Sequence, residues 1–330
     1  MAKIVRFHEY GGPEVLKIEE APLQQPGNGE VRLQVQAIGL NRAESMFFHN
    51  QYVEEPKLPS RLGYEAAGVV EAVGPDVDKS WLGKQVATIP AFSMTHYGTA
   101  GEQTVVPVSA LGEYPPNLSA VEGAAIWMQY LTAYGALIHF GHLTKGDFVL
   151  ITAASSSVGL AALEIARAEG AISIATTRTS SKKQELLDHG ATHVIATEEE
   201  DLVSRVKETT AGKGARIIFD PVAGPFLETL AGAAARSGII FEYGLLSGKP
   251  TPFPVGPAII NWLTVQGYSL MEITTSPGKL TAAKKYVYDR LQDGRFRPRI
   301  AKTFPFAQIV EAYRYLESNA QVGKIVVTVP

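Results

Sequence analysis

The 330-residue sequence contains no cysteine, which excludes disulfides, thiolate nucleophiles and cysteine-ligated metals. It also lacks an excess of either charge: the formal net charge is −3, so electrostatics gives no reason to expect nucleic acid or a membrane surface as a partner. The longest apolar stretch without a charge, residues 148–163, is too short and too rich in serine to span a bilayer. The N-terminus has no apolar core of signal-peptide length. We therefore expect a cytoplasmic protein with neither nucleic acid nor membrane as partner.

The sequence divides into two parts of different pattern, as its length suggests. Up to about residue 124 it is rich in short strands separated by glycine and proline turns. From about residue 118 strands alternate with helices, which predicts right-handed crossovers and a parallel sheet in an α/β fold. The strands are predicted over 2–7, 16–20, 31–38, 68–73, 85–90, 148–152, 171–176, 193–195, 216–220, 239–243, 264–270 and 324–329. The helices are predicted over 120–140, 160–169, 182–189, 202–209 and 278–292.

The most informative stretch runs from Asp147 to Leu160. A short apolar strand, a turn of small residues and a helix follow one another, as in the first unit of a dinucleotide-binding fold. Of the three glycines in the usual fingerprint, Ala154 and Ser156 replace two, and Gly159 remains. The predicted pyrophosphate-binding residues of this turn are Ser155, Ser156, Ser157, Val158 and Gly159. The alternative is that the serines only cap the helix.

The end of the second predicted strand indicates which nucleotide is bound. A fold that prefers NAD carries a carboxylate there for the ribose 2′-hydroxyl. The stretch 176–183 contains no acid and offers Thr177, Arg178 and Lys182. Hydroxyls and cations accept a 2′-phosphate, which a carboxylate would repel. The sequence therefore predicts NADPH as the cofactor; the alternative is an exposed basic helix start.

Four segments carry a family resemblance: 63–74 (GYEAAGVVEAVG), 81–86 (WLGKQV), 131–134 (LTAY) and 153–159 (AASSSVG). They resemble quinone oxidoreductases, the zinc-independent branch of the medium-chain dehydrogenase/reductases, which includes the ζ-crystallins. The resemblance extends over essentially the whole chain. It implies a GroES-like β-rich catalytic domain, residues 1–124 and 271–330, and a Rossmann domain with a doubly wound parallel sheet, residues 125–270. It also implies a homodimer formed through the last Rossmann strand.

The same resemblance bears on the metal. Zinc-dependent relatives carry their ligands at the positions of Asn41, Tyr64 and about Met128. None of these supplies a thiolate or an imidazole, so we expect no metal site. Without a Lewis acid, the acceptor must itself take up a hydride readily, as a quinone or an α,β-unsaturated carbonyl does. The family implies the same substrates.

The resemblance also suggests individual site residues. Asn41 matches an asparagine near the substrate, and Tyr52 matches a tyrosine that points toward it in quinone reductases and enoyl-thioester reductases. Tyr64 is bulkier than the usual residue and is a second possible donor. Tyr52 as a packed aromatic side chain is the alternative. On the cofactor side the matching residues are Thr132, Tyr243, Gly244 and Leu245.

The sequence thus predicts NADPH-dependent reduction of a quinone or an enone. An enoyl-thioester reductase is an alternative of the same class. A different class would be a ζ-crystallin-like structural or RNA-binding protein with incidental activity; the net charge of −3 argues against RNA binding. The physiological acceptor stays open.

Overall fold

The computed structural model describes residues 1–330 and contains two compact units. The β-rich unit comprises residues 1–128, 274–292 and 297–330; the Rossmann unit comprises residues 129–273 and 293–296. None of the helices combines the length and the apolar character that crossing a membrane requires. The two units are described in turn.

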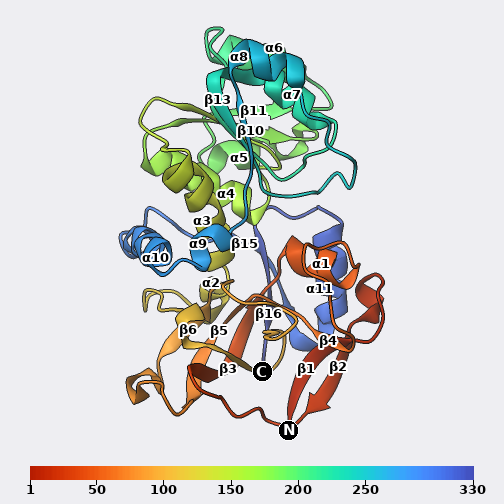
Figure 1. Ribbon diagram of the computed structural model, residues 1–330, viewed down its shortest axis with the longest axis vertical. Helices are drawn as coiled ribbons and strands as arrows, with labels where there is room; N and C mark the ends of the chain where they lie inside the picture. Colours follow the sequence, from red (N-terminus) through yellow and green to blue (C-terminus); the bar gives the residue numbers. More distant parts are fainter. The chain divides into compact units, whose positions relative to one another are not determined.

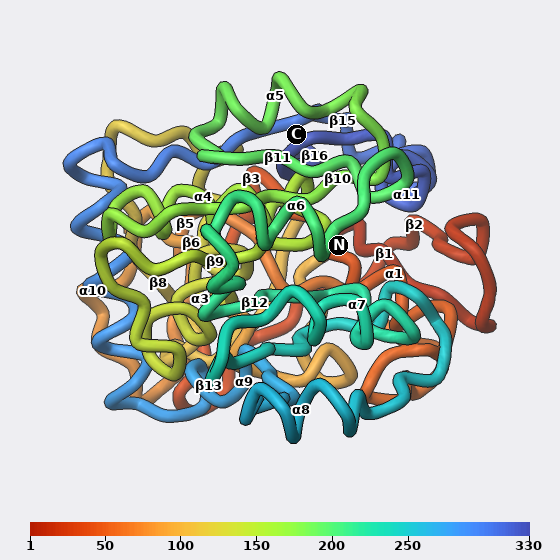
Figure 2. The backbone as a smooth tube through the Cα atoms, turned by 90° about the horizontal axis from the view of Figure 1, so that it is seen from above, coloured from red at the N-terminus to blue at the C-terminus, as the bar shows by residue number.

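The Rossmann unit is built on a six-stranded sheet in which all neighbouring strands are parallel. Its order is β11-β10-β9-β12-β13-β14, and Figure 2 shows the strands following one another from β11 to β13. The order equals 3-2-1-4-5-6 along the chain, which is the doubly wound arrangement that the sequence predicts. The strands are β9 (Phe148–Ile151), β10 (Ile172–Thr177), β11 (His193–Ala196), β12 (Ala215–Asp220), β13 (Ala234–Glu242) and β14 (Thr264–Gly267).

Helices pack on this sheet, as Figure 1 shows for α5 to α8 around β10, β11 and β13. They are α4 (Ser157–Ala168), α5 (Lys183–Asp188), α6 (Leu202–Thr209), α7 (Phe226–Ala233) and α8 (Val255–Asn261). The strands are buried on both faces and are therefore almost continuously apolar. One core cluster includes Leu150, Ile174, Ile218 and Ile240, all of them fully buried. Such strands appear in the sequence as continuous apolar runs, which is why the sequence predicts them.

The helix expected over residues 120–140 is interrupted. The structure has α2 (Ala120–Gly123), α3 (Trp127–Tyr134) and a π-helical segment over Gly135–Phe140. A Cβ at Gly135 would lie 1.9 Å from the Tyr268 hydroxyl and 2.7 Å from Ile273, so glycine permits close packing there. That tertiary contact cannot be seen in the periodicity of the sequence. The helices predicted from the sequence also do not include α7 and α8.

The β-rich unit has a seven-stranded sheet and a three-stranded sheet. The larger sheet has the order β15-β16-β3-β5-β6-β8, with β7 paired to β3, and the smaller has the order β2-β1-β4. The strands are β1 (Ala2–Phe7), β2 (Lys17–Ala21), β3 (Glu30–Gly39), β4 (Ser60–Arg61), β5 (Glu65–Val73), β6 (Gln85–Thr88), β7 (Gln103–Pro107), β8 (Leu111–Gly112), β15 (Ile300–Pro305) and β16 (Lys324–Thr328). The C-terminal strands thus complete a sheet begun by the N-terminal half of the chain.

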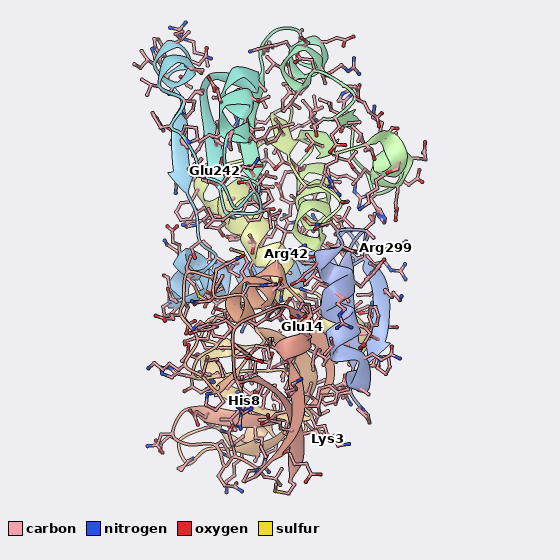
Figure 3. The ribbon with its side chains drawn as sticks, turned by 90° about the vertical axis from the view of Figure 1, so that its right-hand side faces the viewer. Lys3, His8, Glu14, Arg42, Glu242 and Arg299 are labelled. Carbon is pink, nitrogen blue, oxygen red and sulfur yellow. The ribbon has the colours of Figure 1, made fainter.

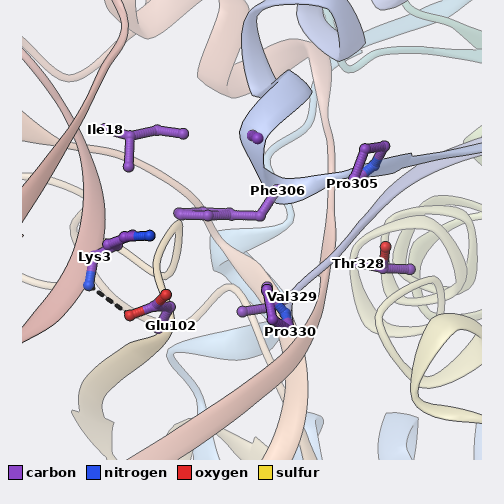
Figure 4. A pocket seen from close by; sticks show the side chains of 9 residues that line it. Lys3, Ile18, Glu102, Pro305, Phe306, Thr328, Val329 and Pro330 are labelled. Carbon is purple, nitrogen blue, oxygen red and sulfur yellow. Dashed lines mark hydrogen bonds between the residues drawn. The ribbon is translucent and has the colours of Figure 1, made fainter.

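Helices α1 (Arg42–Phe48) and α11 (Ile309–Glu317) of this unit lie side by side, and α10 (Pro277–Gln292) also belongs to it. A cavity of about 350 Å³ lies near the chain termini (Figure 4). At its edge the Lys3 backbone N–H donates to the Glu102 carboxylate over 2.7 Å. The cavity is lined by Lys3, Ile18, Glu102, Pro305, Phe306, Ala307, Thr328, Val329 and Pro330. No residue predicted for the site is among them.

A group of charged and polar side chains is buried in the β-rich unit, and we call it the Lys324 cluster: Asn41, Glu44, Glu65 and Lys324. The Lys324 side chain is fully buried, and its ammonium donates to Asn41 Oδ1 over 2.6 Å and to the Glu65 carboxylate. Glu65 also accepts the Met128 backbone N–H over 2.8 Å. The cluster therefore joins β16, β5, the start of α1 and the start of α3.

Glu44 connects this cluster to the N-terminus of α1. Asn41 is the N-cap of the helix, and its backbone N–H donates to Glu44 Oε2 over 2.5 Å in a capping box. Glu44 Oε1 accepts from the Asn41 side-chain amide over 3.1 Å and from the Tyr64 backbone N–H over 3.1 Å. A capping box satisfies helix-terminal N–H groups that would otherwise be buried without partners.

The Lys324 cluster generates a stability prediction. Lys324→Met removes the one cation and leaves buried carboxylates uncompensated, so the free energy of unfolding should fall by about 3–5 kcal/mol. Adding Glu65→Gln should recover part of that loss. Urea denaturation monitored by circular dichroism measures both changes.

The matched control is Lys285→Met, which removes an exposed lysine of α10 that pairs with Asp289. It should change stability by about 0.5 kcal/mol or less. If Lys324→Met is as stable as this control, the cluster does not hold the unit together.

Candidate active site

The three substrate-side residues predicted from the sequence, Asn41, Tyr52 and Tyr64, meet in the β-rich unit. Asn41 caps α1, Tyr52 follows that helix, and Tyr64 directly precedes β5. The Tyr52 ring packs edge-on against Tyr64, with 6.4 Å between ring centroids, and against Phe47 at the same distance. Tyr64 is buried, whereas Tyr52 keeps part of its surface exposed. Tyr52 is therefore the phenol of this pair that can contact a bound molecule.

The electrostatics of this region favour protonated phenols. Burial raises the pKa of both Tyr52 and Tyr64, and the neighbouring Tyr52 adds to the rise for Tyr64. Both phenols therefore stay protonated at neutral pH and are available as hydrogen-bond donors. The carboxylates of Glu44 and Glu54 also raise the pKa of Tyr52 because a phenolate would repel them.

Burial raises the pKa of Glu44 to about 7, against the opposing influence of Lys324 and of its hydrogen bonds. Because the folded state favours the protonated form, this contribution to stability is present at acid pH. It is lost as pH rises from the ordinary range of a glutamate toward 7. Glu44 thus titrates close to neutral pH in the folded protein.

The resemblance places the zinc ligands of zinc-dependent relatives at Asn41, Tyr64 and Met128; here the Asn41 side chain belongs to the Lys324 cluster, and Tyr64 and Met128 contact the cluster through their backbone. Asn41 Oδ1 accepts from Lys324, and the backbone N–H groups of Tyr64 and Met128 donate to Glu44 and Glu65. Throughout residues 1–330 no three His, Cys, Asp or Glu side chains are grouped so that they could hold a metal ion. An ammonium and hydrogen bonds organise this region in the structure.

The turn between β9 and α4 consists of small residues, several of them partly exposed. The Ser156 hydroxyl accepts the Gly159 N–H over 3.0 Å as the N-cap of α4, and Ser155, Ser157 and Val158 are partly exposed. A Cβ at Gly159 would lie 2.6 Å from the Ala154 Cα and carbonyl oxygen, so only glycine fits. Ser156 therefore caps α4, while Ser155, Ser157 and Val158 leave the turn partly exposed.

The end of β10 carries cations next to each other. Arg178 is exposed and Lys182 is partly buried. Burial lowers the pKa of Lys182, and the nearby Arg178 cation lowers it further. Thr177, the last residue of β10, is partly exposed. Two adjacent cations at this edge suit a phosphate monoester.

The structure adds an acid that sequence reasoning missed in this region. Glu199 Oε1, in the turn after β11, accepts the Ser180 backbone N–H over 2.8 Å and the Ser180 hydroxyl over 3.2 Å. The two residues are 19 positions apart in the sequence, so no local sequence pattern predicts this hydrogen bond.

The remaining predicted cofactor residues also belong to the Rossmann unit. Tyr243 stacks on Phe219 with 4.0 Å between ring centroids, and Leu245 is exposed. A Cβ at Gly244 would lie 2.7 Å from the Pro221 carbonyl oxygen. Tyr243, Gly244 and Leu245 thus follow β13 at the carboxyl edge of the sheet, where ligands of this fold bind. Thr132 lies on α3 and is buried.

Not predicted from the sequence are four buried charged residues, Glu44, Glu65, Lys324 and Asp220, and the half-buried Glu242, whose carboxyl oxygens are buried. All except Glu44 lie at an end of an apolar strand. A charged residue in such a position is the feature of the sequence that indicates a buried charge with a partner. Glu44 stands three residues after Asn41, the spacing of a capping box.

Two family models match the chain. The alcohol dehydrogenase GroES-like domain matches residues 27–137, and the zinc-binding dehydrogenase domain matches residues 157–285. The first falls mainly on the β-rich unit and the second mainly on the Rossmann unit.

Full-length relatives extend the match. The chain is 32% identical to quinone oxidoreductase 1 of Escherichia coli, with 98% of both chains covered. It is 29% identical to 2-haloacrylate reductase of a Burkholderia species, with 99% of this chain and 98% of the relative covered. Among solved structures, E. coli quinone oxidoreductase in complex with NADPH has a TM-score of 0.91 at 31% identity, with 99% of this chain and 100% of that chain covered. The protein belongs to the quinone oxidoreductase family of the medium-chain dehydrogenase/reductase superfamily.

Proposed function

We propose that this protein is an NADPH-dependent oxidoreductase that transfers a hydride to a quinone or an α,β-unsaturated carbonyl without a metal ion. The observation that carries the proposal is the Lys324 cluster, which engages Asn41, Tyr64 and Met128 where zinc-dependent relatives hold their metal. The NADPH complex of the E. coli relative supports the cofactor, and the quinone and 2-haloacrylate reductases support the two acceptor classes.

Bound NADPH supplies the hydride. In the proposal, the turn Ser155–Gly159 binds the pyrophosphate, while Arg178 and Lys182 hold the 2′-phosphate. Thr132 and the segment Tyr243–Leu245 complete the cofactor residues. Residues 125–270 thus form the cofactor-binding domain, and residues 1–124 and 271–330 form the catalytic domain. The predicted cytoplasmic location belongs to the same proposal.

The substrate side must stabilise negative charge on oxygen. When a hydride reaches the carbon β to a carbonyl, charge develops on the carbonyl oxygen and needs a donor. Tyr52 is protonated and partly exposed, so it is the candidate acid. Tyr64 packs against its ring, and Asn41 is joined to the Tyr64 backbone through Glu44. For a quinone, the ring of the product stabilises the anion, so this donor matters less.

The proposal includes a homodimer. Strand β14 is an edge of the Rossmann sheet, paired only with β13, so its outer N–H and C=O groups are available to another strand. Close to it in the chain, α8 and its flanks expose large apolar side chains: Phe253, Val255, Ile259, Ile260 and Trp262. An exposed apolar patch beside a sheet edge is typical of a subunit interface.

The first prediction concerns the cofactor. The double variant Arg178→Ala, Lys182→Ala should lose roughly ten- to a hundredfold in NADPH affinity, because two charge-assisted contacts to the 2′-phosphate disappear at a partly solvated site. NADH affinity should barely change. Isothermal titration calorimetry with both cofactors measures this, with Lys213→Ala, an exposed lysine of the same unit, as control. Preference for NADH in the unaltered protein would contradict the assignment.

The second prediction concerns Tyr52. Tyr52→Phe keeps the ring packing and removes the proton, so kcat for enones should fall by about 10²–10⁴. The loss for quinones should be much smaller. Tyr97→Phe, which removes a phenol bonded to Glu30, is the control. A small and equal loss for both acceptors would make Tyr52 a packing residue, and a raised KM with unchanged kcat would make it a binding contact.

The third prediction concerns the dimer. The protein should have twice the chain mass in size-exclusion chromatography with light scattering at micromolar concentration. Ile259→Lys with Ile260→Lys should shift it to the monomer, because two desolvated ammonium groups oppose association. Leu82→Lys, a charge on an exposed leucine of the β-rich unit, should leave the mass unchanged. A monomeric unaltered protein would contradict the dimer.

A further inference from the structure

Two carboxyl groups stand side by side at the carboxyl edge of the Rossmann sheet. Asp220 ends β12 and Glu242 ends β13, and the two residues are direct partners in the register of these parallel strands. Glu242 is labelled in Figure 3. Register partners on adjacent strands project their side chains to the same face of the sheet. Two acids in such a pair are unfavourable unless a proton intervenes.

Asp220 has a full set of donors. The Thr152 hydroxyl donates to its Oδ1, and its Oδ2 accepts the backbone N–H groups of Val222, over 3.1 Å, and of Ala223, over 2.6 Å. Burial opposes the charged form of Asp220 and raises its pKa, but three donors aimed at the two oxygens stabilise the carboxylate. Asp220 is therefore the member of the pair that carries the charge.

Glu242 has the opposite surroundings. Both of its carboxyl oxygens are buried, and neither accepts a hydrogen bond from an N–H or O–H group. Its polar neighbour is the Asp220 carboxyl group. A proton on Glu242 turns this contact into a hydrogen bond from acid to carboxylate, whereas without it two negative charges face each other. Burial, followed by the Asp220 charge, raises the pKa of Glu242 to about 9.

The pair is connected to the predicted pyrophosphate turn in two ways. Thr152, which bonds Asp220, directly follows β9 and leads into the turn. Tyr243, next to Glu242, stacks on Phe219 and lies close to Ser156, the N-cap of α4. The charge on the pair therefore lies within the same edge of the sheet as the turn.

We propose that Glu242 and Asp220 share one proton, and that Glu242 is a positioning residue which, as a neutral acid, keeps this edge at a single negative charge and so permits the dinucleotide's pyrophosphate to bind. The inference rests on the proposed function. A pyrophosphate carries two negative charges, so a second carboxylate beside its turn weakens binding, while an acid bonded to Asp220 does not. NADPH and NADH share the pyrophosphate and are affected alike.

The groups around Glu242 define the pH window. From β12 the facing group is Asp220; β14, on the other side, carries no titratable residue; Tyr243 and Tyr268 follow β13 and β14. Burial raises the pKa of both tyrosines well above its ordinary value, so they stay neutral. The Glu242 pKa is raised in the folded state, so its contribution to stability is lost progressively as pH rises from ~4.3 toward 9. Burial raises the pKa of Glu44 to about 7, so Glu44 titrates at lower pH than Glu242.

The experiment compares Glu242→Gln with the unaltered protein. Gln keeps the shape and a donor for Asp220 but does not titrate. Between pH 7.5 and 9 the ligand-free unaltered protein should lose up to roughly tenfold in its folded-to-unfolded ratio per pH unit relative to Glu242→Gln. Between pH 8 and 10 its affinities for NADPH and NADH should fall by roughly three- to tenfold more than those of the variant. Glu228→Gln, an exposed acid on α7, is the control and should behave as the unaltered protein.

NADH separates this effect from the titration of Lys182, which weakens NADPH binding alone. A measurement without any variant is infrared spectroscopy of the ligand-free protein: the carbonyl band of a buried protonated acid should be present at pH 8 and lost by pH 10.5. Absence of that band at pH 8, or equal pH dependence in Glu242→Gln and the unaltered protein while cofactor binding is intact, would overturn the inference. Failure of the unaltered protein to bind NADPH at pH 7.5 would instead overturn the proposed function, and the cofactor role of Glu242 with it.

Discussion

The β-rich unit depends most on the buried ion pair and hydrogen bond that the Lys324 ammonium makes with Glu65 and Asn41. The ammonium compensates Glu65 and orients Asn41, and through Asn41 and Glu44 it fixes the start of α1 and the backbone before β5. A buried pair of this kind contributes little net stability compared with an apolar packing, yet losing one member is costly. It therefore specifies one arrangement of the helix and strand ends. The same arrangement orients the region from which Tyr52 acts in the proposed reaction.

The candidate cofactor site of the Rossmann unit is formed in a different way. Parallel strands buried on both faces bring the residues that follow each strand to one edge, where backbone donors and short side chains remain accessible. Gly159 permits the tight approach of α4 to the turn, and Ser156 caps that helix. The charged groups at this edge include two pairs, Arg178 beside Lys182 and Asp220 beside Glu242. In the proposed function, the protonation of Lys182 and Glu242 governs how strongly this edge binds an anion.

The sequence was sufficient for the parallel sheet, because continuous apolar runs separated by helical periods have few other solutions. It was also sufficient for the turn before α4 and the strand end at Thr177. It failed where tertiary contacts override local pattern: the helix over 120–140 is broken, with Gly135 packed against Tyr268. It also failed for the Lys324 cluster and for the Asp220–Glu242 pair. The residues that pair in these groups are far apart in the sequence. A charged residue in an apolar strand indicates that it has a partner, but it does not identify that partner.

In the proposed reaction, hydride transfer to an activated acceptor proceeds with protein donors in place of a metal. This mechanism is tested most directly by NADPH oxidation at about 340 nm across a panel of quinones, enals, enones, enoyl thioesters and simple alcohol–ketone pairs. The protein is assayed before and after exhaustive chelation, with its metal content determined by elemental analysis. We predict undiminished turnover of quinones or enones after chelation, none with simple ketones, and no stoichiometric metal. Activity that disappears on chelation and returns with zinc would contradict the account.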